Sequence, residues 1–202
     1  MRPGRVLAEG RLNPLFADID VTQAKAFQRD LLRLEEARAA RTDMAAAYFA
    51  AHAEEWDSLR SLHVAESEVE AAIGQILRTA PLGHVLDVGT GTGRMMELFA
   101  AEAGHFVALD NSTDMLRLAR AKLGNMDAKV ASKVDIMLGD FNALPLGDEA
   151  FDTILFHQVL HYAQHPEGVI AEAARVLKPK GRLVIVDFAT HDREELRTVH
   201  AH

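Results

Sequence analysis

The sequence of 202 residues contains no cysteine. Disulfide bonds, a catalytic thiolate and cysteine-held metal sites are therefore excluded. Long apolar runs are missing as well, since nowhere do about 18 apolar residues follow one another, as a membrane-spanning helix requires. The first residues, Met-Arg-Pro-Gly-Arg, are not followed by the apolar segment of a signal peptide. We therefore expect a cytoplasmic protein without a membrane partner.

Positive charge is also in short supply. The chain has 22 Lys plus Arg against 30 Asp plus Glu, which gives a formal net charge of -8. A protein that binds the phosphate backbone of nucleic acids needs the opposite balance, and no basic stripe or zinc-finger spacing is present. We expect no nucleic acid to be bound by this chain itself.

The most informative segment is His-Val-Leu-Asp-Val-Gly-Thr-Gly-Thr-Gly at residues 84–93, where a hydrophobic strand ends in three glycines. Gly89, Gly91 and Gly93 allow the backbone to turn sharply and to approach a ligand without an intervening Cβ. A helix is expected to follow, and its free backbone amides would face a polar group of the ligand.

The spacing of these glycines argues against a dinucleotide cofactor. The fingerprint G-x-G-x-x-G/A requires a small third residue, which allows close contact between helix and strand. Counted from Gly89 that place is Arg94, and counted from Gly91 it is Met96. An NAD-dependent oxidoreductase is therefore the less favoured interpretation.

The chain is divided here into an N-terminal extension, residues 1–50, and a main domain, residues 51–202. Residues 21–51 are rich in helix-forming Ala, Leu, Arg and Glu. We interpret this segment as a helix that lies on the domain or on a partner subunit, and a homodimerisation arm is the alternative. Its apolar face is formed by Ala24, Phe27, Leu31 and Leu34.

From residue 69 onward, helical and strand patterns alternate, which predicts an α/β fold with a doubly wound, Rossmann-like, mostly parallel sheet. The strands are apolar without alternation, as expected where helices cover both faces. Strands are predicted at 84–88, 105–110, 134–138, 151–156 and 182–188. Helices are predicted at 69–77, at 92–103, from a Ser112 cap to 123, and from Pro166 to Leu177 with Val169, Ile170, Ala173 and Val176 on one face.

Ligands of such sheets bind where the strands end. The first strand ends in Asp87 and the glycine loop, and the second ends at Asp110, where a carboxylate can accept both hydroxyls of a ribose. After the third strand, Asp140 suits the exocyclic amine of an adenine, and Phe141 suits its ring. The fourth strand leads to His157.

Over residues 45–190 this set resembles the class I S-adenosylmethionine (SAM) methyltransferases, and among them the small-molecule group that includes the ubiquinone and menaquinone biosynthesis enzymes. The resemblance implies that SAM is the cofactor and S-adenosylhomocysteine the product. The segment Arg-Val-Leu-Lys-Pro-Lys-Gly at 175–181 matches the turn that this group places before its fifth strand. By the same resemblance, the cofactor contacts are Asp87, Gly89, Thr90, Gly91, Gly93, Asp110, Asn111, Met115, Asp140, Phe141 and His157.

The implied reaction is methyl transfer to a small-molecule acceptor by in-line displacement, for which the protein mainly positions and desolvates the reactants. His157 and His161 are the candidate catalytic bases, and a helix after the fourth strand would place them one turn apart. Alternatively, His157 only shapes the pocket. His165 extends the spacing, but no glutamate lies between these histidines and Pro166 follows, so no metal site is predicted.

Related enzymes use residues ahead of the core as a lid, which makes Tyr48, Trp56 and Arg60 candidates for substrate or lid contacts. Trp56 could instead anchor its helix to the core. The family's sheet ends with another helix and two strands, for which the 14 residues after Phe188 are too few. We therefore expect these C-terminal strands to be missing and the fifth strand to be an open edge.

The stretch from residue 31 to 63 also resembles the methyltransferase half of regulators in which an ArsR-type winged helix precedes this domain. No helix-turn-helix pattern is present in residues 1–50, so DNA binding would belong to other sequence. The main alternative function is accordingly a non-catalytic, SAM-binding regulatory domain.

Overall fold

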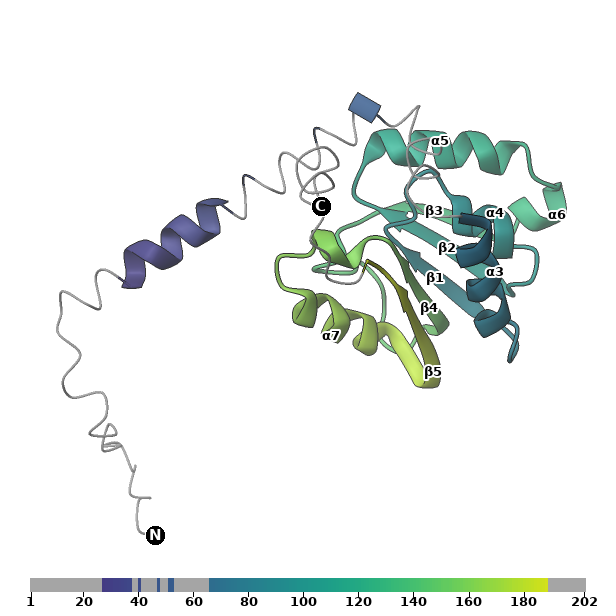
Figure 1. Cartoon of the computed structure of the whole chain (residues 1–202). Helices are drawn as coiled ribbons and strands as arrows, with labels where there is room; N and C mark the ends of the chain where they lie inside the picture. The colour runs from purple at the N-terminus through teal and green to yellow at the C-terminus, as the bar shows by residue number, and fades with distance from the viewer. Residues whose placement is uncertain (1–26, 38–39, 41–46, 48–50, 53–65, 189–202) are drawn as a thin grey trace, which may run out of the picture. The chain divides into compact units, whose positions relative to one another are not determined.

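A computed structural model of the chain describes residues 27–37, 40, 47, 51–52 and 66–188 (Figure 1). The chain divides into two units, Met1–Arg41 and Thr42–His202, each of which is described by itself. In the first unit, residues 27–37 form the predicted helix. Its apolar side chains are exposed, with Phe27 at 65% and Leu31 at 43%. Dimerisation through this face stays a prediction.

The second unit is built on a five-stranded sheet with the strand order β3-β2-β1-β4-β5. All neighbouring strands are parallel (Figure 1). The chain moves outward from β1 to β3 and then returns to the other side of β1 with β4, so the direction reverses between β1 and β4. The predicted doubly wound α/β fold is confirmed. The strands are β1 (His84–Val88), β2 (His105–Asp110), β3 (Val134–Leu138), β4 (Phe151–His157) and β5 (Leu177–Val186).

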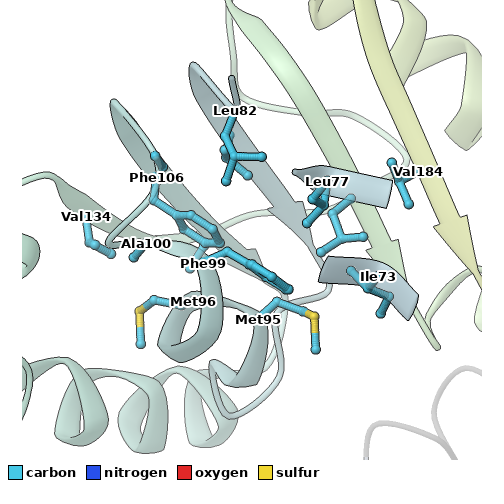
Figure 2. Packing of buried hydrophobic residues seen from close by; sticks show 14 residues of the cluster. Ile73, Leu77, Leu82, Met95, Met96, Phe99, Ala100, Phe106, Val134 and Val184 are labelled. Atoms are coloured by element: carbon cyan, nitrogen blue, oxygen red, sulfur yellow. The ribbon is translucent and has the colours of Figure 1, made fainter. Parts of the chain in front are cut away.

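Helices cover both faces of this sheet and bury two apolar clusters. One cluster joins α3 and α4 to β2, with Phe99 and Phe106 almost fully buried (Figure 2). The other joins α7 to β1 and β4. Burial of one such large side chain contributes about 1.5–3 kcal/mol to stability. The helices are α3 (Glu66–Leu77), α4 (Arg94–Phe99), α5 (Thr113–Gly124), α6 (Ala128–Ala131), the 3-10 helix η3 (Leu160–Tyr162) and α7 (Pro166–Val176).

Four local expectations differ from the structure. Helix α4 is shorter than predicted: it begins only after Gly93, which has a φ of +84°, and it already ends at Phe99. Ile170 is partly exposed, although Val169 and Ala173 beside it are buried as predicted. The turn predicted at residues 178–181 lies within β5 as an irregularity with Lys180 at a φ of +66°. The helix α6 is not indicated by the sequence, because its four residues are too few to show periodicity.

Among residues 66–188, β5 pairs only with β4, which leaves the expected open edge in this part of the chain. The prediction of missing C-terminal strands concerns residues outside those described. No helix within the described ranges is long and apolar enough to cross a membrane.

Candidate functional site

The glycine loop after β1 brings three backbone segments close together. Gly89 and Gly93 have φ values of +71° and +84°, in the left-handed region that favours glycine. A Cβ on Gly89 would overlap the side chain of Val159, which follows β4. A Cβ on Gly93 would lie 3.2 Å from that of Ala119 in α5. Gly93 therefore permits the close packing that Arg94 and Met96 do not.

The amides of the glycine loop are used for hydrogen bonds within the protein. The Gly89 and Thr90 amides both donate to the carbonyl oxygen of Leu109, at 2.8 and 2.9 Å. The Gly91 amide donates to Asp110, and the Gly93 amide donates to the Thr90 carbonyl. The end of β2 therefore accepts three of these four amides, whereas the prediction of free amides concerns the start of the following helix. These four amides are therefore not the donors that a pyrophosphate would need.

Asp110 is fixed at the end of β2 by the loop that it faces. Its Oδ2 accepts the Gly91 amide and its Oδ1 accepts the Ser112 amide, both at 2.8 Å. Burial raises the pKa of Asp110 above its usual value of 3.8, and the hydrogen bonds from Ser112, Gly91 and Asn111 oppose this increase. Since each carboxylate oxygen has two lone pairs, both can still accept a hydroxyl.

The neighbours of Asp110 take the expected positions. Ser112 caps α5, accepting the Met115 amide at 3.3 Å as predicted. Met115 is buried and Asn111 is exposed.

Asp87 and Thr90 are buried polar residues at the carboxyl end of β1 and in the glycine loop that follows it. Asp87 is 1% exposed and Thr90 is 7% exposed. The Thr90 hydroxyl has no hydrogen-bond partner among the described residues. A buried hydroxyl of this kind is suited to a polar ligand group.

The pair Asp140 and Phe141 follows β3, beside the end of β2. The amide of Gly139 donates to the Asp110 carbonyl at 3.0 Å, which ties the two strand ends together. Oδ1 of Asp140 accepts both the backbone amide and the side-chain amide of Asn142, at 2.8 Å each. Asp140 is exposed, whereas Phe141 is half-buried against the α7 cluster. An exposed carboxylate next to an anchored ring is suited to an amine-bearing planar base.

The two candidate histidines are not one turn apart on a helix, so that prediction is wrong. His157 is the last residue of β4 and pairs with Val186. Gln158 has a φ of +55°, and its amide donates to the Val186 carbonyl at 2.7 Å, which continues the pairing of β4 with β5. No helix therefore begins at Gln158. His161 lies separately, in η3.

His161 contacts a carboxylate that the sequence analysis missed. Its Nδ1 lies 2.6 Å from Oδ1 of Asp187, directly after β5, and its backbone amide donates to Oδ2 at 3.2 Å. Burial raises the pKa of Asp187, but the hydrogen bonds and charge of His161 and the Phe188 amide outweigh burial, so the pKa lies below 3.8. An ionised carboxylate only accepts hydrogen bonds, so the Nδ1 atom carries the proton. Asp187 lies at the carboxyl end of its strand, as Asp87 and Asp110 do, and that signal could have identified it.

Arg94 has a structural contact that explains its place in the glycine loop. Its Nε and one terminal nitrogen donate to the two carboxylate oxygens of Glu70 in α3, at 2.7 and 2.8 Å. The ion pair joins α3 to the start of α4. In a dinucleotide site this position is occupied by a small residue, whereas here Arg94 occupies it and binds α3 through Glu70.

Of the remaining predicted groups, the structure describes only His165. Tyr48, Trp56 and Arg60 lie outside the described residues. His165 is exposed and lies 3.4 Å from Glu167. Within the described ranges, no group of three His, Asp or Glu side chains could hold a metal ion.

Comparison with known proteins agrees with this geometry. Residues 86–185 match the family described as methyltransferase domain. The chain is 34% identical over 120 residues to a demethylmenaquinone methyltransferase of Renibacterium salmoninarum, covering 59% of this chain and 47% of the relative. It is also 34% identical over 119 residues to a malonyl-[acyl-carrier protein] O-methyltransferase of Methylococcus capsulatus, covering 58% of this chain and 42% of the relative.

A solved structure gives the same result. A SAM-dependent methyltransferase from Aquifex aeolicus matches with a TM-score of 0.53 at 26% identity, covering 60% of this chain and 66% of that chain. The chain spans about half the length of the two curated relatives. The parallel sheet, the strand ends and these matches together show that the chain belongs to the class I SAM-dependent methyltransferase family.

Proposed function

We propose that this chain binds SAM and transfers its methyl group to a small-molecule acceptor. The observation that carries the proposal is Asp110, a half-buried carboxylate at the end of β2 that the glycine loop holds by the Gly91 amide. Each of its two oxygens keeps capacity to accept a further hydrogen bond, as binding of two ribose hydroxyls requires. The loop itself offers little to a pyrophosphate, which favours SAM over a dinucleotide.

The proposed cofactor contacts follow the strand ends. Asp110 would accept the ribose hydroxyls, and Asp140 with Phe141 would contact the adenine. Gly89, Gly91 and Gly93 would allow the methionine end to approach the backbone, beside Asp87 and Thr90. Asn111, Met115 and His157 complete the proposed contacts.

When bound, SAM supplies a methyl group on a sulfonium, and the acceptor atom displaces it in line. The chain's contribution is to orient the acceptor, exclude water and take up a proton where the acceptor has one. Because Asp187 holds the Nδ1 proton of His161, the neutral form of this ring carries its lone pair on Nε2. We propose Nε2 as the atom that receives the acceptor's proton, with Asp187 as a positioning residue. His157 is then a pocket residue rather than a base.

Calorimetry on the full chain with S-adenosylhomocysteine and with NADH tests the cofactor. We expect binding of the first only, and loss of that binding in Asp110→Asn. Asp152→Asn is the matched control, because Asp152 also accepts a backbone amide, from His84 at 2.8 Å, but lies near the start of β4. Binding of NADH alone would contradict the proposal.

Transfer of labelled methyl from SAM tests the activity. Reduced demethylmenaquinone is the first acceptor to try, because relatives at 34–36% identity carry that name. His161→Ala should lower turnover more than cofactor affinity, whereas His157→Ala should act mainly on affinity. Cofactor binding without transfer to this or any acceptor in a metabolite extract would favour the non-catalytic regulatory domain.

A further inference from the structure

Arg175, the first residue of the family-like segment 175–181, has no part in the function proposed so far. Its guanidinium donates five hydrogen bonds, which is its full capacity. Nε and one terminal nitrogen bind the carboxylate of Glu172, at 2.9 and 2.8 Å. The other three bonds reach the loop between β3 and β4, at the Leu144 carbonyl (3.0 Å), the Leu146 carbonyl (2.9 Å) and the Asp148 carboxylate (2.7 Å).

Glu172 contacts the same loop directly. Its Oε2 accepts the Leu144 amide at 3.0 Å, so Leu144 is held through both its amide and its carbonyl. The Leu144 side chain is buried in the α7 cluster. Together the two charged side chains of α7 hold the middle of this loop at Leu144 and Leu146.

The other end of this loop presents the proposed adenine contacts. Ala143, which precedes Leu144, donates its amide to the Asp140 carbonyl at 3.2 Å. A displacement of Leu144 therefore reaches Asp140 through a single hydrogen-bonded turn. Gly139 is tied to Asp110, so the loop is held between the ribose side and α7.

We infer that Glu172 and Arg175 are positioning residues that set the selectivity of the cofactor site for the adenine base. The inference rests on the proposed function. The ion pair fixes the turn that aims Asp140 at the exocyclic amine, although neither residue touches the cofactor. An arginine is required, because a lysine has three donors on one compact head and cannot bind Glu172 and two carbonyls in a fixed plane.

The test compares two ligands in calorimetry with the full chain. S-adenosylhomocysteine has the exocyclic amine, whereas S-inosylhomocysteine has an oxygen in its place. For the unmodified chain we expect tighter binding of the adenine compound. Arg175→Lys and Glu172→Gln should each reduce the ratio of the two affinities by roughly tenfold, which corresponds to the loss of one modest hydrogen bond. Asp140→Asn should reduce the ratio as well, and combining it with Arg175→Lys should add little.

Arg182→Lys is the matched control. Arg182 also donates to several carbonyls, among them those of Leu77 and Pro81, but these lie at the end of α3. This variant should lose stability to urea and keep the ratio of affinities. A chain that binds neither compound would refute the proposed function. A chain that prefers the adenine compound, with that preference unchanged in Glu172→Gln and in Arg175→Lys, would overturn the present inference alone.

Discussion

Gly89→Ala is expected to destabilise the fold for two separable reasons. Gly89 has a φ of +71°, and a residue with a Cβ in this conformation costs about 1–2 kcal/mol. The new Cβ would also overlap the side chain of Val159, and overpacking of this kind costs about 1–3 kcal/mol. The sum is about 2–5 kcal/mol, a large part of the roughly 5–15 kcal/mol that stabilises a typical domain.

A double-mutant cycle separates the two terms. Val159→Ala removes the two γ-carbons that the new Cβ would meet but keeps the Cβ of residue 159, which lies 2.8 Å away. The double variant should therefore recover part of the about 1–3 kcal/mol of overpacking and retain the backbone term. Urea unfolding of the full chain, followed by circular dichroism, gives the four free energies of unfolding.

Gly168→Ala is the control, because Gly168 lies in α7 with no atom within 4 Å of an added Cβ. We expect this variant to gain up to about 1 kcal/mol. A free energy of unfolding of Gly89→Ala within about 0.5 kcal/mol of that of the unmodified chain would contradict this prediction. So would a cycle that shows no coupling energy between residues 89 and 159.

Three further predictions concern charged groups. Because burial raises the pKa of Asp110, the affinity of the chain for S-adenosylhomocysteine should fall as the pH drops through a value above 3.8. At neutral pH, calorimetry on Asp110→Asn should show a roughly ten- to hundredfold loss of this affinity, since hydrogen bonds to a charged group are lost. Glu70→Gln should weaken the contact with Arg94 and cost about 1 kcal/mol in urea unfolding, with a smaller cost at high salt. The pKa of Asp187 is lowered in the folded state, so its contribution to the free energy of unfolding is present above pH 3.8 and is lost as the pH falls through the lower folded value. In urea unfolding, Asp187→Asn should lack this loss of stability in acid. Nitrogen NMR of the same variant should show a changed tautomer of His161.

The sequence by itself determined the fold class and the order of strand ends. Apolar runs such as 84–88 and the Ser112 cap are signals within a few residues of one another, so they can be read without the fold. The rule that ligands bind at the ends of parallel strands then placed Asp87, Asp110 and Asp140 at one edge of the sheet. The same rule would have identified Asp187, had it been applied to the fifth strand.

Only the tertiary structure decided which groups contact one another there. Asp187 and His161 are 26 positions apart, and Arg175 reaches a carbonyl 31 positions before it. The glycine-loop amides are likewise occupied by the end of β2, some 20 residues later in the chain. No local pattern contains these pairs, because they form only when parallel strands bring distant segments to the same edge. The sequence therefore indicated where the cofactor would bind, and the packing of the strands decided which donors, carboxylates and histidines are left to bind it.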